Sequence, residues 1–200
     1  MAKDMYSSGL VAHSFWFLEF KQLVLLRRDG MEYDAIKKKC VEENLFGAAK
    51  EYRAQRMAGY LINRLKTLDN AGVELFCNTD LATQKLLTLI AILRSDRLYF
   101  DFLYEVYREK AVLGTNILED MDVNAFFSQK EQQSEVVAAW EDVTRRRLRS
   151  SYMNFLTDAG LLTVIDKEKR ITPAVLDYKL EQYLYACGEE VLVKALTGVN

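Results

Sequence analysis

The chain has 200 residues and a mass of 23.1 kDa; half of the residues are apolar and 28% are charged. This balance is typical of a folded protein and excludes a disordered chain. One proline and nine glycines leave few turns, which disfavours β-sandwiches and barrels and favours long helices. We therefore expect an all-α fold, a compact multi-helix globule.

Catalytic and metal-binding residue types are sparse. The single histidine, His13, argues against zinc sites, Ser/His/Asp triads and Cys/His dyads, which need imidazole as ligand or base. The odd number and wide spacing of Cys40, Cys77 and Cys187 predict reduced thiols in the cytoplasm, not a disulfide frame. No glycine-rich phosphate loop followed by lysine is present. We expect a non-catalytic protein with no cofactor.

The apolar stretch Leu10 to Leu26 resembles a membrane segment at first sight. A spanning helix needs about 20 nearly uncharged residues, and Glu19 and Lys21 interrupt this stretch. The expected structure is a buried helix, with no membrane contact.

Helical periodicity accounts for most of the chain. The breakers include Asp29-Gly30, Asn70-Ala71-Gly72 and Pro173. Gly114 to Asp122 is the expected seam between an N-terminal bundle, 1–115, and a C-terminal unit, 116–200, packed together as one globule. Helices are predicted over residues 10–28, 33–43, 48–68, 80–94, 96–112, 122–132, 134–142, 145–159 and 174–186.

One segment departs from the helical pattern. The β-prone runs in 161–172 flank a charged tip, Asp166 to Lys169, which predicts a β-hairpin. A hairpin directly after a helix is where a winged helix-turn-helix carries its wing.

The net charge of −2 conceals a segregation along the chain. Residues 33–66 carry a net +4, residues 67–142 a net −8 and residues 143–170 a net +4. Clustered basic residues are the electrostatic signature of nucleic-acid binding. Both basic segments coincide with a predicted helix-turn-helix.

The first predicted helix-turn-helix spans about 33–68. Side chains three residues apart share one arc of a helix, and the buried residues further along leave the first turns of the second helix free to protrude. The expected DNA contacts are Lys37, Lys38, Lys39, Lys50, Arg53 and Arg56.

The second predicted helix-turn-helix spans about 134–172, with the predicted hairpin over about 161–172 in the position of a wing. Leu148, Tyr152, Phe155, Leu156 and Ala159 form its apolar stripe. Arginine pairs with guanine edges and asparagine with adenine edges, so the opposite face suits the major groove; pairing of the arginines with Glu141, Asp142 or the acidic middle is the alternative. The expected contacts are Arg145, Arg146, Arg147, Arg149, Ser150 and Asn154, with Lys167 and Lys169 at the hairpin.

Two other functions compete with DNA binding. Carboxylates cluster at Asp96, Asp101, Glu105 and Glu109 and again at Glu119, Asp120 and Asp122, which suggests a metal-dependent nuclease as an alternative. The signal is weak, because Asp96 and Asp101 lie on different helix faces and the Asp120 cluster lies in a predicted loop without a partner lysine on a strand. The aromatic helix from Leu98 to Tyr107 belongs to the core or to a protein-facing surface. A scaffold that docks other proteins therefore stays open as the alternative.

Several segments in order resemble the BrxA proteins of BREX (bacteriophage exclusion) phage-defence systems, over nearly the whole chain. No single segment is diagnostic, but their order and spacing are moderately specific. They are Ser7-Ser8-Gly9-Leu10, Asn44-Leu45-Phe46, Arg53 to Arg56, Asn63-Arg64-Leu65, Leu86 to Phe102, Asn124-Ala125-Phe126-Phe127, Thr144 through Leu162 and Ile171-Thr172-Pro173.

The resemblance implies a small, mainly helical, non-catalytic component of a multi-gene system that methylates host DNA and blocks phage DNA replication. It implies binding to double-stranded DNA through helix-turn-helix elements, and other BREX proteins as partners. Homologues have sometimes been labelled inner-membrane proteins, which the charge pattern here speaks against. The oligomeric state stays open, with a monomer slightly favoured.

Overall fold

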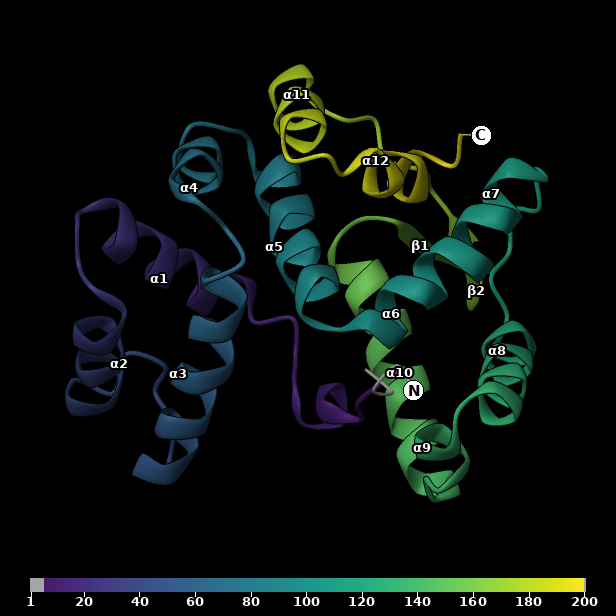
Figure 1. Cartoon of the computed structure of the whole chain (residues 1–200), viewed down its shortest axis with the longest axis horizontal. Coiled ribbons are helices and arrows are strands. Elements are labelled where there is room, and N and C mark those ends of the chain that lie inside the picture. The colour runs from purple at the N-terminus through teal and green to yellow at the C-terminus, as the bar shows by residue number, and fades with distance from the viewer. Residues whose placement is uncertain (1–5, 200) are drawn as a thin grey trace. The chain divides into compact units, whose positions relative to one another are not determined.

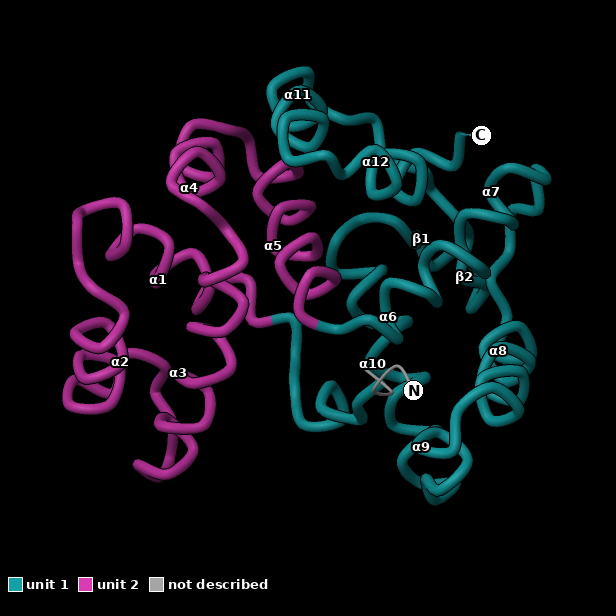
Figure 2. Tube along the Cα trace, viewed as in Figure 1, with its two compact units in different colours: residues 1–15, 96–200 teal, residues 16–95 magenta. Residues whose placement is uncertain are grey.

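The structure, a computed structural model, describes residues 6–199 and is mainly helical (Figure 1). The predicted all-α class with a short C-terminal hairpin is confirmed. The chain forms two compact units (Figure 2). Unit 2 runs from Trp16 to Ser95; unit 1 comprises the chain up to Phe15 and from Asp96 onward. The predicted division into 1–115 and 116–200 stays a prediction.

Unit 2 is built around a central helix, α5. All residues of α5 from Thr83 to Leu93 except Lys85 are buried, so this helix is buried on nearly every side. The helices α1, α3 and α4 pack against it, and α2 packs on α3. The helices are α1 (Phe17–Arg28), α2 (Tyr33–Glu42), α3 (Glu51–Leu65), α4 (Asn70–Cys77) and α5 (Leu81–Ser95).

Unit 1 combines helices with one hairpin. Its first segment is a short 3-10 helix, η1, and a π-helical segment, η2, continues α6 into α7. The elements are η1 (Gly9–Ala12), α6 (Arg97–Phe102), η2 (Leu103–Arg108), α7 (Glu109–Val112), α8 (Asp120–Gln133), α9 (Glu135–Ala138), α10 (Asp142–Asp158), β1 (Leu162–Ile165), β2 (Glu168–Ile171), α11 (Tyr178–Ala186) and α12 (Glu190–Thr197).

The predicted helix over 10–28 is wrong in its first half. Trp16 adopts a left-handed conformation with φ 50°, which an α-helix cannot contain. The neighbouring rings have different partners: Phe15 lies 6.2 Å from Phe155, and Trp16 stacks on Tyr60. Because each aromatic ring packs in its own unit, the helix begins only at Phe17.

Two further helices were not predicted. Asn70-Ala71-Gly72, expected as a break, is the first turn of α4, because the Asp69 side chain accepts the backbone N–H of Gly72 at 2.8 Å. The short helix α12 follows Gly188, and the helix predicted from residue 174 begins at Tyr178. A capped helix tolerates glycine in its first turn when the cap satisfies its N–H.

The predicted hairpin is present, and a third segment joins it. Leu162 pairs with Ile171 and Ile165 with Glu168 in antiparallel register. Ile117 forms a β-bridge with Arg170 on the other edge of β2. A short extended segment before α8 thus supports a hairpin that would be marginal alone.

An aromatic core fixes the position of α10. Tyr152 is fully buried, 4.5 Å from the ring of Tyr99, 5.3 Å from Phe102 and 5.8 Å from Phe127 between ring centroids. Buried aromatic pairs at these distances add to the hydrophobic gain of burial. The aromatic residues of α6 therefore serve chiefly as core; Phe100 is half-buried.

Part of the acidic segment 67–142 is paired with basic side chains inside unit 1. The buried Lys130 lies 2.7 Å from Glu105 and 3.8 Å from Asp101, which also pairs with Arg97 at 2.7 Å. Lys130 and Asp101 are both buried, and buried charges persist only when paired. No group of three or more His, Cys, Asp or Glu in residues 6–199 is arranged to hold a metal ion.

The apolar helices do not form a membrane span. Within residues 6–199, no helix combines the length and the apolar character that crossing a bilayer requires.

Candidate nucleic-acid interface

The helix α10 has one buried and one exposed face. Its buried stripe is the predicted one: Leu148, Tyr152, Phe155, Leu156 and Ala159 are all buried. The helix begins at Asp142, three residues before the predicted start. The arginines from Arg145 to Arg149 therefore all lie within the helix, in its N-terminal half.

The exposed face of α10 carries four of the predicted contacts, Arg146, Arg147, Ser150 and Asn154. Among residues 6–199, neither Arg146 nor Arg147 forms an ion pair. The Ser150 hydroxyl donates to the carbonyl of Arg146 at 3.2 Å. Two solvated guanidinium groups and one solvated amide thus share one side of this helix.

The other two arginines of this segment are held by acidic neighbours. Arg145 donates to the carbonyl of Trp140 at 2.7 Å and pairs with Glu131 and Asp142. Arg149 donates to the Asn124 side chain at 3.1 Å. Its guanidinium also lies 3.9 Å from Asp120. Arg145 and Arg149 are thus paired within the molecule, as the alternative hypothesis predicted. Arg146 and Arg147 face solvent, as the DNA-binding hypothesis requires.

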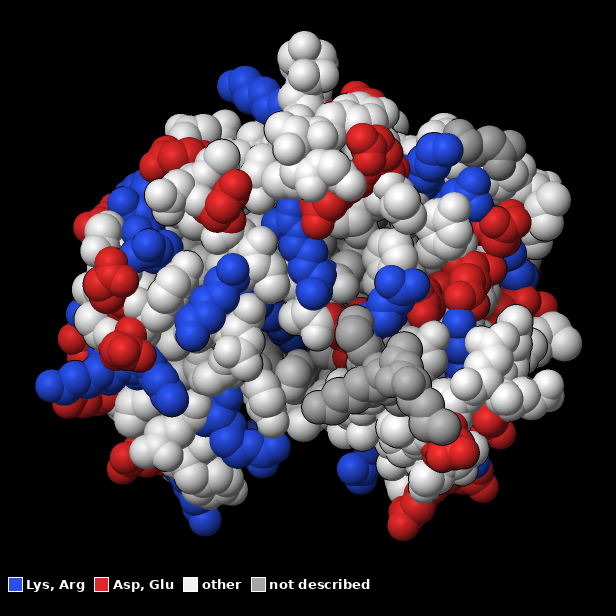
Figure 3. Space-filling model, viewed as in Figure 1, with Lys and Arg blue, Asp and Glu red and all other residues white. Residues whose placement is uncertain are grey.

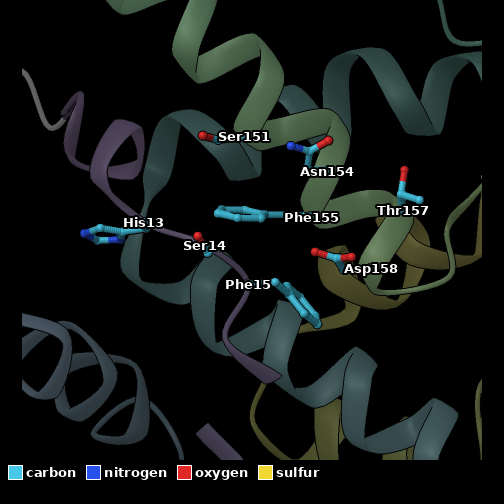
Figure 4. A pocket seen from close by; sticks show the side chains of 8 residues that line it. All are labelled: His13, Ser14, Phe15, Ser151, Asn154, Phe155, Thr157 and Asp158. Atoms are coloured by element: carbon cyan, nitrogen blue, oxygen red, sulfur yellow. The ribbon is translucent and has the colours of Figure 1, made fainter. Parts of the chain in front are cut away.

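Two shallow depressions border the exposed face of α10, one formed with Val11 of η1 and the other with residues 13–15, which follow η1. The first, of about 480 Å³, is lined by Val11, Val143, Arg146, Arg147, Ser150 and Ser151. The second, of about 320 Å³, contains Asn154 and is shown in Figure 4. There Asn154 and Asp158 project from α10, with Ser14 and Phe15 across from them (Figure 4). The sequence did not predict this role for residues 11–15, which adjoin α10 only in the folded chain.

The hairpin places its lysines differently. Lys167 is exposed in the two-residue turn, with φ 69° after φ 50° at Asp166. Lys169 is half-buried on β2 and pairs with Asp120 at 3.4 Å. Of the two predicted contacts on the hairpin, Lys167 is the one that extends into solvent.

The first basic segment lies in unit 2, on α2 and α3. Lys38 pairs with Glu42 at 3.7 Å and Lys39 with Glu43 at 2.6 Å. Both are pairs four residues apart on the helix surface, which are weak in water. Lys37 is exposed and, within residues 6–199, has no ion pair.

The second helix of this segment begins later than predicted. Lys50 is the residue that precedes α3, in an extended conformation with φ −144°, and Arg53 lies in the first turn; both are exposed. Arg56 is exposed and lies over the ring of Tyr60, 6.0 Å from its centroid. The turn before α3 is closed by Asn44, whose amide bonds both the N–H and the carbonyl of Ala48.

The surface between α2 and α3 is of mixed charge. A depression of about 690 Å³ is lined by Lys37, Lys38 and Arg56, but also by Asp34, Glu42 and Glu51. Basic and acidic side chains are interspersed over this part of the molecule (left half of Figure 3). The positive charge of the segment 33–66 is therefore partly offset by carboxylates at its own surface.

A family model and a curated relative both identify one family for this chain. The family model of BrxA matches residues 4–188. A relative from Bacillus cereus (strain H3081.97), named BREX protein BrxA, is 33% identical over 196 residues, 98% of this chain and 98% of the relative. The crystal structure of an uncharacterized protein from Magnetospirillum magneticum has a TM-score of 0.83 at 18% identity, covering 97% of this chain and 99% of that chain. The last likeness shows a shared fold, and the first two show that the chain belongs to the BrxA family.

Proposed function

We propose that this chain is a non-catalytic, double-stranded-DNA-binding component of a bacterial BREX phage-defence system. The name of the Bacillus cereus relative supports the place in BREX. The observation that carries DNA binding is the exposed Arg146 and Arg147 on the first turns of α10, without an ion pair among residues 6–199. Exposed arginines on a helix beside a hairpin are suited to phosphate and base edges.

The order of elements supports a winged helix-turn-helix in unit 1. The bridge at Ile117 precedes α8, the short α9 follows, and α10 leads directly into β1 and β2. In this arrangement α10 is the recognition helix and the hairpin is the wing. We infer that Lys167 at the wing tip contacts phosphate beside the groove that α10 enters.

The unit 2 segment around α2 and α3 is proposed as a second, weaker DNA contact, through Lys37, Lys50 and Arg53. A cytoplasmic location and contacts with other BREX proteins follow from the proposed role. The exposed side chains of α10 are arginine, serine and asparagine, which are residue types that contact phosphates and base edges. We therefore propose a binding protein and not an enzyme.

The proposal is tested by titrating the protein onto labelled duplex at several salt concentrations. With four to eight phosphates neutralised, the log–log slope of affinity against salt should be about −4 to −7. Replacing Arg146 and Arg147 by Glu removes two attractions and adds two repulsions, each on the order of 1 kcal/mol, so affinity should fall on the order of 100- to 1000-fold. A flat salt response would remove the electrostatic mechanism.

The matched control is the double variant Lys179→Glu and Lys194→Glu, on exposed positions of α11 and α12. It changes the net charge equally and should leave affinity within about threefold, because long-range charge effects are screened beyond about 10 Å. Both variants should melt close to wild type. Arg145 and Arg149 are left intact, since reversing them would break their pairs with Glu131 and Asp120.

A scaffold role is the second candidate, favoured by a half-exposed aromatic pair. Phe100 and Tyr104 stack with centroids 6.1 Å apart, and Arg97 and Arg108 lie over their rings. Aromatic and arginine side chains are enriched at protein interfaces. If purified protein shifts no duplex at low salt but retains BREX proteins after nuclease treatment, the scaffold is the function and DNA binding is wrong.

A further inference from the structure

Ser150 and Asn154 lie within the arc that the two exposed arginines, Arg146 and Arg147, bound on α10. At about 100° per residue, Ser150 and Asn154 fall about 40° and about 80° round the helix from Arg146, and Arg147 falls about 100° round. All four side chains are exposed. The two cations therefore flank a central strip that carries a small hydroxyl and a primary amide.

This layout matches the cross-section of a major groove. The groove is about 12 Å wide, with a phosphate backbone on each side and base edges between them. In this placement the two arginines, at the edges of the exposed face, face phosphate, and the strip that carries Ser150 and Asn154 faces the bases. The Ser150 hydroxyl is occupied with the carbonyl of Arg146, so this small side chain leaves room for close approach and the amide of Asn154 is left to contact a base.

The amide of Asn154 has its hydrogen-bonding capacity available. Among residues 6–199 it forms no hydrogen bond, whereas the amides of Asn44 and Asn124 are both bonded. Asparagine is among the less favourable residues inside a helix, so helix formation does not account for it at this position. A carbonyl and an NH₂ side by side pair bidentately with N6 and N7 of adenine and with no other base in the same way.

The charge along α10 also limits which turns enter the groove. Asp158, one turn beyond Asn154, is exposed and lies in the same depression as Asn154. Its carboxylate is repelled by phosphate, so the last turn stays outside. Asn154 is then the last exposed side chain of the helix that reaches base edges.

From this placement we infer that Asn154 is a specificity-determining residue that selects adenine in the major groove, while Arg146 and Arg147 bind phosphate regardless of sequence. The inference rests on the proposed DNA binding and adds a base preference to it. The two arginines thus supply affinity for any duplex, and the neutral amide of Asn154 supplies discrimination between bases.

The experiment is selection of bound duplexes from a random-sequence library by the full chain, followed by affinity and salt-slope measurements on the selected duplex. The selected pool should contain one position at which adenine dominates. Replacing that A·T pair should weaken binding about 5- to 150-fold for wild type. Asn154→Ala should lose this discrimination while keeping the wild-type salt slope, and Asn154→Gln, whose amide pairs with adenine in the same way, should restore it.

Asn63→Ala is the matched control, at an exposed asparagine on α3, and should keep the preference. A pool as random as the input, from a protein that still binds duplex with a steep salt slope, overturns the inference and leaves the proposed function standing. An adenine preference that survives Asn154→Ala also overturns it. Absence of any duplex binding contradicts the proposed function itself.

Discussion

Asp96 is a buried carboxylate at the beginning of α6. Its side chain accepts the backbone N–H of Tyr99 at 2.8 Å, and its residue is 6% exposed. Burial raises the pKa of Asp96 to about 6, against the opposing effect of the backbone hydrogen bonds from Tyr99 and Leu98. Desolvation thus outweighs the cap.

The raised pKa gives Asp96 a definite effect on stability. The folded protein holds this proton up to about pH 6, whereas the unfolded chain releases it near pH 4. Protonated Asp96 therefore stabilises the folded state by on the order of 2 to 3 kcal/mol below about pH 4, and this stabilisation is lost as the pH rises towards 6. Asp96→Asn keeps an acceptor for Tyr99 and should gain that amount relative to wild type between pH 4 and pH 7 in urea unfolding.

Asp80 provides the control of opposite sign. It accepts the N–H of Thr83 at 2.8 Å, and this backbone hydrogen bond lowers the pKa of Asp80. Asp80→Asn should therefore be less stable than wild type at pH 7, with the difference vanishing as the pH falls below the ordinary range of Asp. Identical pH profiles for wild type and Asp96→Asn would contradict the assigned role of burial.

Neighbouring arginines on α10 differ because of residues far away in the sequence. The chemistry and the helical face of Arg146 and Asn154 were predictable from spacing alone. The fate of Arg145 and Arg149 was not, because their carboxylate partners Glu131 and Asp120 come from α8. Helical periodicity predicts which way a side chain points on its own helix. It does not predict which carboxylate of a second helix will lie beside that side chain.

At the level of elements, the hairpin shows how a turn limits its residues. The turn residues Asp166 and Lys167 have φ 50° and 69°, as in the type I′ turn that joins twisted strands. For residues other than glycine this conformation costs about 1 to 2 kcal/mol per residue, somewhat less for aspartate. The sequence predicted the charged tip. The backbone is strained there because Asp166 and Lys167 occupy positions that favour glycine.

The same substitution at two lysines of the hairpin should have opposite effects on stability. Lys167→Gly relieves the positive φ and should raise the free energy of unfolding by about 0.5 to 1 kcal/mol. Lys169→Gly, inside β2, should lower it by about as much. Chemical denaturation of both variants measures the contrast, and a loss of stability in Lys167→Gly would show that the turn is not strained.

The elements that the sequence predicted best are those with an uninterrupted apolar period, such as α5 and α10. The prediction of one helix over 10–28 was wrong because the apolar run is continuous in sequence, whereas Phe15 and Trp16 pack on different partners in the structure. The first turn of α4 was missed because Gly72 resembles a break until Asp69 is seen to cap it. Tertiary packing and capping geometry decided both cases.

At the scale of the whole molecule, each compact unit contains one of the two basic segments of the sequence. The net +4 segment 33–66 belongs to unit 2, and the net +4 segment 143–170 belongs to unit 1. In each, part of the charge is neutralised by acids, as in Lys39 with Glu43 and Arg145 with Glu131. The net charge of each basic segment therefore overstates the number of basic side chains without an acidic partner.

The contribution of unit 2 is measured by Lys50→Glu combined with Arg53→Glu. If both units contact one duplex, this variant and the Arg146→Glu, Arg147→Glu variant should each make the salt slope less steep by about 2, because each lost phosphate contact removes about 0.9. The loss from Lys50 and Arg53 should be confined to duplexes long enough to contact both units, whereas the loss from Arg146 and Arg147 should persist on short ones. An unchanged slope for Lys50→Glu, Arg53→Glu on every length would assign all DNA contact to unit 1.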